Sequence, residues 1–180
     1  MKLTKKKLKS LNPCTDGYEF YLKCNTTDLK MFIKELMKIG RFDWANWLLP
    51  RLMTHKQKIM YAVFAAKQVL PIFEQEYPKN KIPRLAIEAA EKCIKHNTVK
   101  NRKIAASAAN AASAASAASA AFAGYAAFAA SAGYAAFAAS ATFAAFAAFA
   151  GYAASADRKE MQTKVINNGL KILNVKSEIS

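Results

Sequence analysis

The segment AGYAAFAASAGYAAFAAS, residues 123–140, repeats one nine-residue unit and indicates the fold of the region around it. In each unit a Tyr, a Phe and a Ser follow one another at intervals of three, from Tyr125 to Ser140. A helix turns once in about 3.6 residues, so each step of three moves back by about 60° and the aromatic rings reach every side. Since Ala is the strongest helix former, we predict a helix that other helices must surround.

The whole Ala-rich tract, residues 104–156, could form one rod or fold back on itself. A rod would be about 80 Å long, whereas a compact chain of this size has a radius of gyration of about 16 Å. Gly124, Gly133 and Gly151 offer natural breaks. We therefore expect an all-α helical domain in which the long tract is folded back into closely packed helices. The rod remains the alternative.

Helix signals also precede the tract. Thr27 is a plausible cap for a helix over residues 28–39, which Gly40 would stop. Thr54 and Gln57 form a capping box at the start of another helix. That helix should kink or end at Pro71.

Pro83 suits the first turn of a helix over residues 83–96, and Asn97 or Thr98 is placed to end it and to cap the next one. The apolar face of the helix after Pro83 would be Leu85, Ile87, Ala90 and Ile94. A closing helix over residues 157–173 would bury Met161, Val165, Ile166 and Leu170. We expect one further core from Trp44, Trp47 and Leu48 with Val69, Leu70 and Phe73.

The charge pattern divides this single expected domain into four parts. Residues 1–10 form a basic, mobile arm, and residues 11–103 form a basic amphipathic helical half. The tract of residues 104–156 carries no charge, and residues 157–180 supply the closing helix and a tail. With 27 basic and 12 acidic side chains, the chain should attract nucleic acid, an anionic membrane or an acidic protein. The alternative is that Lys only keeps the chain soluble.

Composition bears on localisation. The odd count of three Cys does not suit a disulfide scaffold, and the basic start has no apolar run of the secretory kind. The uncharged tract is long enough to span a bilayer, but Ala is only weakly apolar and residues 105–156 contain no Leu, Ile or Val. We therefore expect a cytoplasmic protein and do not expect a membrane partner.

Three motifs occur in a fixed order: WANWLLPRLM (44–53), AVFAAKQVLPIFEQEYP (62–78) and RLAIEAAEKC (84–93). Ala triplets and a short closing helix follow. This order resembles an alanine-rich family of immunity proteins of bacteria and phages, over roughly residues 40–173. The sequence departs from the family at Ile82-Pro83-Arg84, where the family tends to carry Arg-Pro, and in triplets that hold Ser, Phe and Tyr in place of charges. The resemblance implies neutralisation of a toxin or effector by binding, without catalysis.

Candidate chemistry is sparse. Cys93 and His96 have a CxxH spacing that Cys14 and Cys24 could complete as a zinc site, but Cys93 also fits an apolar helix face. Glu88 and Glu91 could pair catalytically, although support of the helix together with Arg84 explains them as well. Because the chain also has no Gly-rich phosphate loop and no nucleophile triad, we expect no enzyme activity, cofactor or metal.

Basic residues that lie among the sequence motifs and after the last of them suggest a binding surface. This basic strip could contact phosphates or acidic side chains, and it consists of Lys56, Lys58, Lys67, Lys95, Lys100, Arg102 and Lys103. We expect an immunity or anti-defence protein, carried by a bacterium or a phage, that binds an acidic or nucleic-acid-bound effector. One alternative is an RNA- or nucleotide-binding protein that sequesters its ligand. Another is a structural protein that forms oligomers through the Ala-rich tract.

Overall fold

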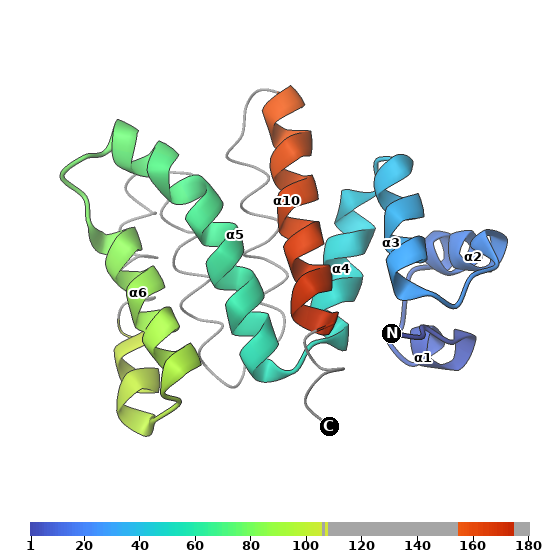
Figure 1. Ribbon diagram of the computed structural model, residues 1–180, viewed down its shortest axis with the longest axis horizontal. Coiled ribbons are helices and arrows are strands. Elements are labelled where there is room, and N and C mark those ends of the chain that lie inside the picture. Colours follow the sequence, from blue (N-terminus) through green and yellow to red (C-terminus); the bar gives the residue numbers. More distant parts are fainter. Residues whose placement is uncertain (106, 108–154, 175–180) are drawn as a thin grey trace.

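The computed structural model describes residues 1–105, 107 and 155–174 (Figure 1). Within these residues, regular structure is helical apart from a single bridge between Lys2 and Asp28. The protein is therefore all-α, as the sequence predicts. The folding back of the Ala-rich tract concerns residues that lie almost entirely outside the described ones.

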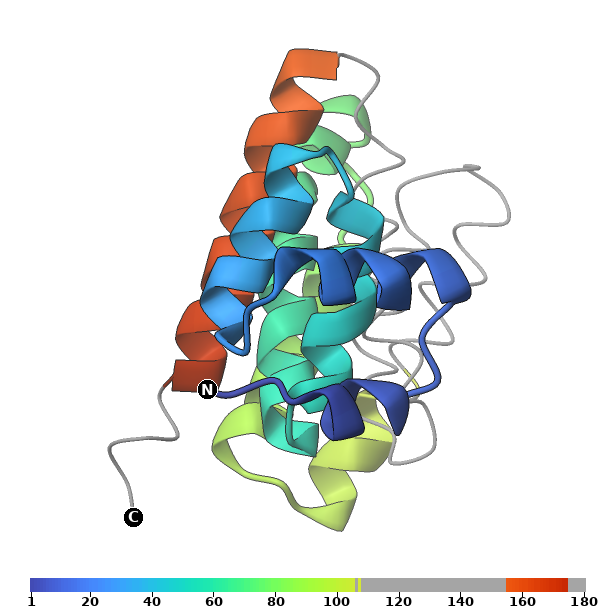
Figure 2. The ribbon, with the colours of Figure 1, turned by 90° about the vertical axis from the view of Figure 1, so that its right-hand side faces the viewer.

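The helices lie side by side in a row, and the last helix of the chain occupies a place in the middle of it (Figure 1). In chain order they are α1 (Lys5–Lys9), α2 (Thr15–Cys24), α3 (Leu29–Lys38), α4 (Phe42–Leu52), α5 (His55–Glu76), α6 (Ile82–Lys95) and α10 (Ser155–Asn174). A further helix begins at residue 99. Figures 1 and 2 show α5 and α6 as an antiparallel hairpin, with α10 between α5 and α4 and with α1 to α3 beyond α4.

The basic arm is packed against the molecule, and the expectation of a mobile arm is wrong. Leu3 and Leu8 are buried. The Leu3 backbone N–H donates to the carbonyl oxygen of Thr27 at 2.7 Å, and the Tyr21 hydroxyl donates to the carbonyl oxygen of Leu3. The two leucines give the arm enough apolar surface to dock, while its lysines stay exposed.

Local capping chemistry was predicted well. The backbone N–H of Thr54 donates to Gln57 Oε1 at 2.9 Å, and the backbone N–H of Gln57 donates to Thr54 Oγ1 at 3.4 Å. The cap of α3, however, is Asp28 and not Thr27, because the Asp28 carboxylate accepts the N–H of Met31 at 3.0 Å. The negative charge of Asp is also stabilised by the positive end of the helix dipole.

α5 continues past Pro71 to Glu76, so the helix does not end at this residue. Its ring is exposed to solvent. The missing N–H therefore removes one hydrogen bond on the outer side, while neighbouring Leu70 stays buried against α6. Pro83 lies in the first turn of α6, as predicted.

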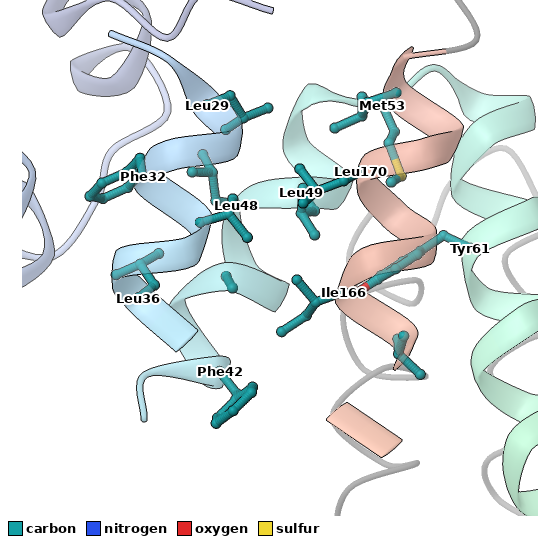
Figure 3. Packing of buried hydrophobic residues seen from close by; sticks show 14 of the residues in the cluster. Leu29, Phe32, Leu36, Phe42, Leu48, Leu49, Met53, Tyr61, Ile166 and Leu170 are labelled. Carbon is teal, nitrogen blue, oxygen red and sulfur yellow. The ribbon is translucent and has the colours of Figure 1, made fainter. Parts of the chain in front are cut away.

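The central core extends from α10 through α4 to the N-terminal helices (Figure 3). We use this name for the buried cluster that α10 forms with α4, with Tyr61 and Ala65 of α5, and with the helices before them. All four residues predicted for the closing helix are buried in it: Met161, Val165, Ile166 and Leu170. A Cβ atom on Gly169 would lie 2.7 Å from Tyr61 Cε2 and 3.0 Å from Leu49 Cδ1, so the absence of a side chain allows α10 to approach this closely.

The hairpin core is a separate cluster between α5 and α6. It contains Ile59, Ala62, Val63, Ala66, Leu70, Ala86, Ile87 and Ala90. Leu48 lies in the central core and Leu70 in the hairpin core, so the single core expected from both is not formed. Leu85 is 57% exposed, which corrects the predicted apolar face of α6. The buried face of α6 is therefore narrower than the predicted one. Four of the eight residues of the hairpin core are Ala, and small side chains of this kind allow two helices to pack closely.

Candidate functional site

Six of the seven residues of the basic strip gather at one end of the hairpin. Lys56 and Lys58 lie in the first turn of α5, and Lys95 is the last residue of α6. Lys100, Arg102 and Lys103 follow in the helix that starts at residue 99. Since α5 and α6 are antiparallel, the beginning of α5, the end of α6 and this next helix share the lower end of the hairpin in Figures 1 and 2.

Lys67 is placed apart from this group. Its Nζ atom lies 2.5 Å from Glu91 Oε1 of α6, so its charge is already paired. A second ion pair joins Arg84 of α6 to Glu74 of α5, with Arg84 Nε 2.6 Å from Glu74 Oε1. Lys67 and Glu74 are seven positions apart on α5, and their partners Glu91 and Arg84 are seven positions apart on α6. Both ion pairs therefore fit the same antiparallel register. Arg84 and Glu91 therefore join α6 to α5, while the charge of Glu88, one turn after Arg84, also raises the pKa of Arg84, as expected for support within the helix.

The remaining six cations form what we call the basic end: Lys56, Lys58, Lys95, Lys100, Arg102 and Lys103. Among the described residues, none of the six side chains has a carboxylate within ion-pair distance. The sequence contains no Asp or Glu between positions 44 and 73 or between 92 and 156. The basic end therefore has a positive potential that no acidic neighbour in these stretches reduces.

Two of these cations oppose the stability of their own helix. The first turn of α5 contains Lys56 and Lys58 and no acidic side chain. The N-terminus of a helix carries a partial positive charge, so Lys there costs stability where Asp or Glu would add to it. By contrast, Lys95 stands at the favourable end of α6. The first turn of α5 therefore adds to the positive potential at a cost to helix stability.

The turn between α6 and the next helix fixes the other half of the basic end. The N–H of Asn101 donates to Thr98 Oγ1 at 3.1 Å, so Thr98, and not Asn97, is the cap among the two candidates. The Asn101 side chain donates to the carbonyl oxygen of His96 at 2.7 Å. Arg102 is half-buried close to Cys93. Burial raises the pKa of the Cys93 thiol, and the positive charge of Arg102 opposes that rise.

An apolar pocket that the sequence did not reveal lies at the other side of the molecule. Its volume is about 260 Å³, and its lining consists of Leu8, Pro13, Cys14, Gly17, Phe32, Leu36, Asp43, Trp44, Trp47 and Leu48. The two Trp side chains are only half-buried, although the sequence interpretation placed both in a core. Tryptophans in a WANW pattern were the available signal, but the pocket needs α1 to α4 to come together.

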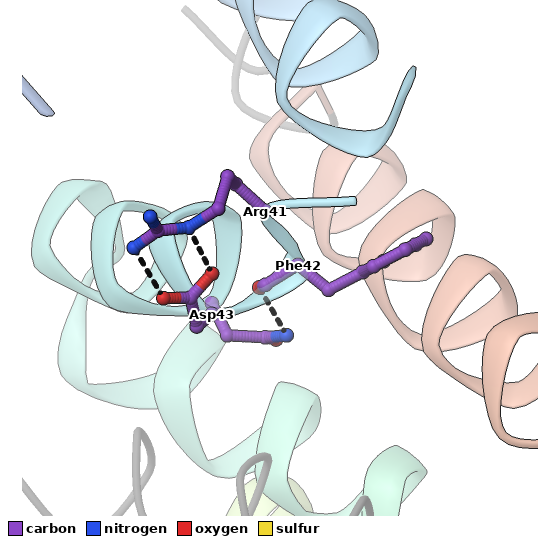
Figure 4. A network of polar contacts seen from close by, with 4 residues as sticks. Arg41, Phe42 and Asp43 are labelled. Atoms are coloured by element: carbon purple, nitrogen blue, oxygen red, sulfur yellow. Dashed lines mark hydrogen bonds and ion pairs between the residues drawn. The ribbon is translucent and has the colours of Figure 1, made fainter. Parts of the chain in front are cut away.

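Arginine side chains hold both Trp rings. The guanidinium carbon of Arg41 lies 3.5 Å from the ring centroid of Trp44, and that of Arg51 lies 4.2 Å from that of Trp47. Arg41 also donates two hydrogen bonds to the Asp43 carboxylate, at 3.0 and 2.7 Å (Figure 4). These contacts fix the rings and neutralise the carboxylate that lines the pocket.

Buried polar groups near α4 have a structural role. Asn46 is fully buried; its amide donates to the carbonyl oxygen of Phe42 at 2.9 Å (Figure 4), and its carbonyl accepts the Tyr61 hydroxyl. Burial raises the pKa of the Tyr61 hydroxyl, which keeps it protonated as a donor. Both side chains are satisfied within the core and present no reactive group to solvent.

The candidate zinc ligands are not brought together. Cys14 and Cys24 lie at opposite ends of α2, whereas Cys93 is buried in α6 with Ala89 and Ala105. His96 is exposed beyond the end of α6. In residues 1–105 and 155–174, no three metal-binding side chains form a group that could hold an ion. No helix in that part of the chain is long and apolar enough to cross a membrane.

Comparison with known proteins gives one finding. The model of the family described as "Imm-5 like putative immunity protein" matches residues 49–170. All six residues of the basic end lie inside the matched region, and all residues that line the apolar pocket lie before it. Neither the curated proteins nor the solved structures contain a match.

Proposed function

Because the chain belongs to the Imm-5 like putative immunity protein family, we propose that it is a non-catalytic immunity or anti-defence protein that neutralises its target by binding. The target is a toxin or a bacterial immune effector, and the chain is carried by a bacterium or a phage. The observation that supports a binding role is the basic end, where six cations lie on elements that share one end of the hairpin and the flanking sequence holds no acidic residue. The family model includes all six of them.

The partner that fits the basic end is an acidic protein surface or an effector that holds nucleic acid. Both present closely spaced anions, and Lys or Arg at the centre of such a contact supplies long-range attraction. The three cysteines are free, which suits the reducing cytoplasm where such a target would be met. We place the protein there.

A charge-reversal variant tests this proposal. Lys100→Glu, Arg102→Glu and Lys103→Glu together should abolish capture of the partner from a lysate of the native host. Lys30→Glu, Lys34→Glu and Lys38→Glu on α3 form the matched control, because they change the net charge equally at exposed positions far along the row of helices. Equal capture by the wild type and by the basic-end variant would contradict the proposal.

Sequestration of RNA or a nucleotide is the second candidate, and the cations in the first turn of α5 favour it. Phosphate contacts release counterions, so affinity for total host RNA should fall steeply as salt rises from about 50 to 200 mM. For an acidic protein partner, the same rise in salt should slow association and should lower the affinity less steeply. Nucleic acid that co-purifies with the chain, seen as a high ratio of absorbance at 260 to 280 nm, would favour this candidate.

Self-assembly through the Ala-rich tract is a third candidate, which concerns residues outside the described ones. Light scattering of the purified chain tests it directly. A single monomeric species would remove it, whereas large particles that persist in high salt would favour it over both binding functions.

A further inference from the structure

We propose that the apolar pocket between α1, α2, α3 and α4 binds one large apolar side chain of an acidic segment on the partner protein. This goes beyond the proposed function, on which it rests only for the partner being a protein. The pocket gives the chain a second recognition surface, separate from the basic end. It is formed entirely by residues before position 49, where the family match begins.

The size and lining of the pocket specify the anchor. A cavity of about 150 Å³ with apolar walls holds a benzene ring, so the 260 Å³ here accommodate a Phe, Leu or Met side chain. The walls include the Trp44 and Trp47 rings, Phe32 and Leu36. Arg41 and Arg51 stack on the two Trp rings, so the walls are already in place before binding.

The charges near the pocket specify the flanks of the anchor. Asp43 is the one charged residue that lines it, and both of its carboxylate oxygens are bound by Arg41. Leu8 contributes one wall from α1, whose four lysines are all exposed and which contains no acidic residue. An apolar side chain inserted here therefore places its neighbours beside positive charge, which favours Glu and Asp in those positions.

A second hollow contains carboxylates and would favour a partner segment with basic flanks, so the charge of the flanks is a testable part of the proposal. It lies on the other side of Trp44 and is lined by Asp16 and Glu19 together with Lys23 and Arg41. A partner segment that ran toward this hollow would carry Lys or Arg beside its apolar anchor. Arg41 is already paired with Asp43, so pocket and hollow together hold three carboxylates, Asp43, Asp16 and Glu19, and two cations, Lys23 and Arg41. We commit to the acidic segment because α1 adds four exposed lysines and no acidic residue, which makes the net charge around the pocket positive.

The probe is a phage-displayed library of random peptides, selected on the immobilised full chain. We expect the selected peptides to share one large apolar residue with Asp or Glu on both sides. The two Trp of the chain both line the pocket, so Trp fluorescence reports its occupation without a label. The leading peptide should change this emission to saturation, and its version with Ala in place of the apolar residue should bind at least about tenfold more weakly.

A filled pocket provides the decisive variant. Gly17 lies in α2, and a Cβ placed there would meet Cys14 Sγ at 3.2 Å and the Trp44 ring at 3.8 Å. Gly17→Leu combined with Cys14→Ala therefore occupies the pocket, and Leu22→Ala, at an exposed position of α2 that does not line the pocket, is the control. Binding of the leading peptide should be lost in the first and kept in the second. Circular dichroism checks that both remain helical.

A charge variant tests the flanks. Replacement of Lys5, Lys6, Lys7 and Lys9 by Gln should weaken the peptide by about tenfold at low salt, whereas Lys30→Gln with Lys34→Gln should change it little. Peptides with basic flanks, binding that survives in the filled pocket, or a selection without any enriched peptide would each overturn the proposal. None of these results touches the basic end, whose own reversal variant tests the proposed function separately.

Discussion

The central core and the hairpin core are built from different side chains. The central core is made mostly of Leu, Ile, Phe and Tyr, and its buried polar groups Asn46 and Gln57 are hydrogen-bonded. Half of the hairpin core is Ala, and two ion pairs lie along its rim. Because burial free energy grows with the apolar area removed from water, stability should be concentrated around α10. The hairpin can therefore carry unfavourable charge at one end without losing the fold.

The largest effect should follow from a cavity in the central core. Ile166 of α10 is fully buried, so Ile166→Ala should lower the free energy of unfolding by about 2–5 kcal/mol. Chemical denaturation followed by circular dichroism measures it, with Ile166→Val as a control that should cost about 0.5–1.5 kcal/mol. If Ile87→Ala in the hairpin core cost more than Ile166→Ala, the comparison between the cores would be reversed.

A close helix contact gives the next effect. Gly169→Ala adds a methyl group that would collide with the Tyr61 ring and with Leu49, both fully buried. We expect a loss of about 1–3 kcal/mol from overpacking, although Ala is the better helix former. Lys171→Ala, on an exposed position of the same helix, is the control. A more stable Gly169→Ala variant would show that α10 does not approach α4 and α5 as closely as described.

The junction between the two cores should respond less. Thr54→Ala removes the hydroxyl that accepts the Gln57 N–H at the start of α5. Loss of such a cap costs about 1 kcal/mol. A thermal melt compared with that of Thr27→Ala would show whether capping matters here, since Thr27 caps no helix in the structure and should change little.

The smallest effect should come from the rim of the hairpin core. Hydrogen bonding from Arg84 lowers the pKa of the Glu74 carboxyl below its ordinary value. The pair therefore stabilises the fold above about pH 4.3, the value for an unfolded Glu, and this contribution is lost as pH falls through the lower folded value. Glu74→Gln should cost less than about 1 kcal/mol near neutral pH.

The pH dependence of that variant distinguishes the ion pair from a packing effect. The difference in melting temperature between Glu74→Gln and the wild type should shrink as the pH is lowered through the acid range. Glu19→Gln, at an exposed position of α2 far from Arg84, is the control. A difference that stays constant between neutral and acid pH would mean that Glu74 contributes through packing and not through its charge.

Local chemistry was readable from the sequence, and contacts between helices were not. Thr54 with Gln57, Thr98 and the four apolar residues of the closing helix depend on neighbours a few positions away. Arg84, by contrast, reaches Glu74 across the hairpin, which its position beside Glu88 does not reveal.

The same reason explains the other corrections. Pro71 is tolerated because its ring faces solvent in the packed helix, and this depends on where α6 lies. The pocket needs four helices to meet, so the pattern of Trp44 and Trp47 alone suggested a filled core. The basic strip could be predicted only in part. The charges of its residues are visible in the sequence, but the pairing of Lys67 with Glu91 depends on the antiparallel register of α5 and α6.

The position of α10 sets a time at which the molecule can be completed during synthesis. The Gln57 side chain donates to the carbonyl oxygen of Ile172, 115 positions later, at 2.7 Å. At about 5–20 residues per second, the ribosome needs roughly 6–23 s to make the chain between these two positions. Throughout that interval Leu49 and Tyr61 have no α10 to cover them, so the nascent chain offers an apolar surface to chaperones. A chain released before Ile172 has been added would therefore lack this contact and could not close its central core.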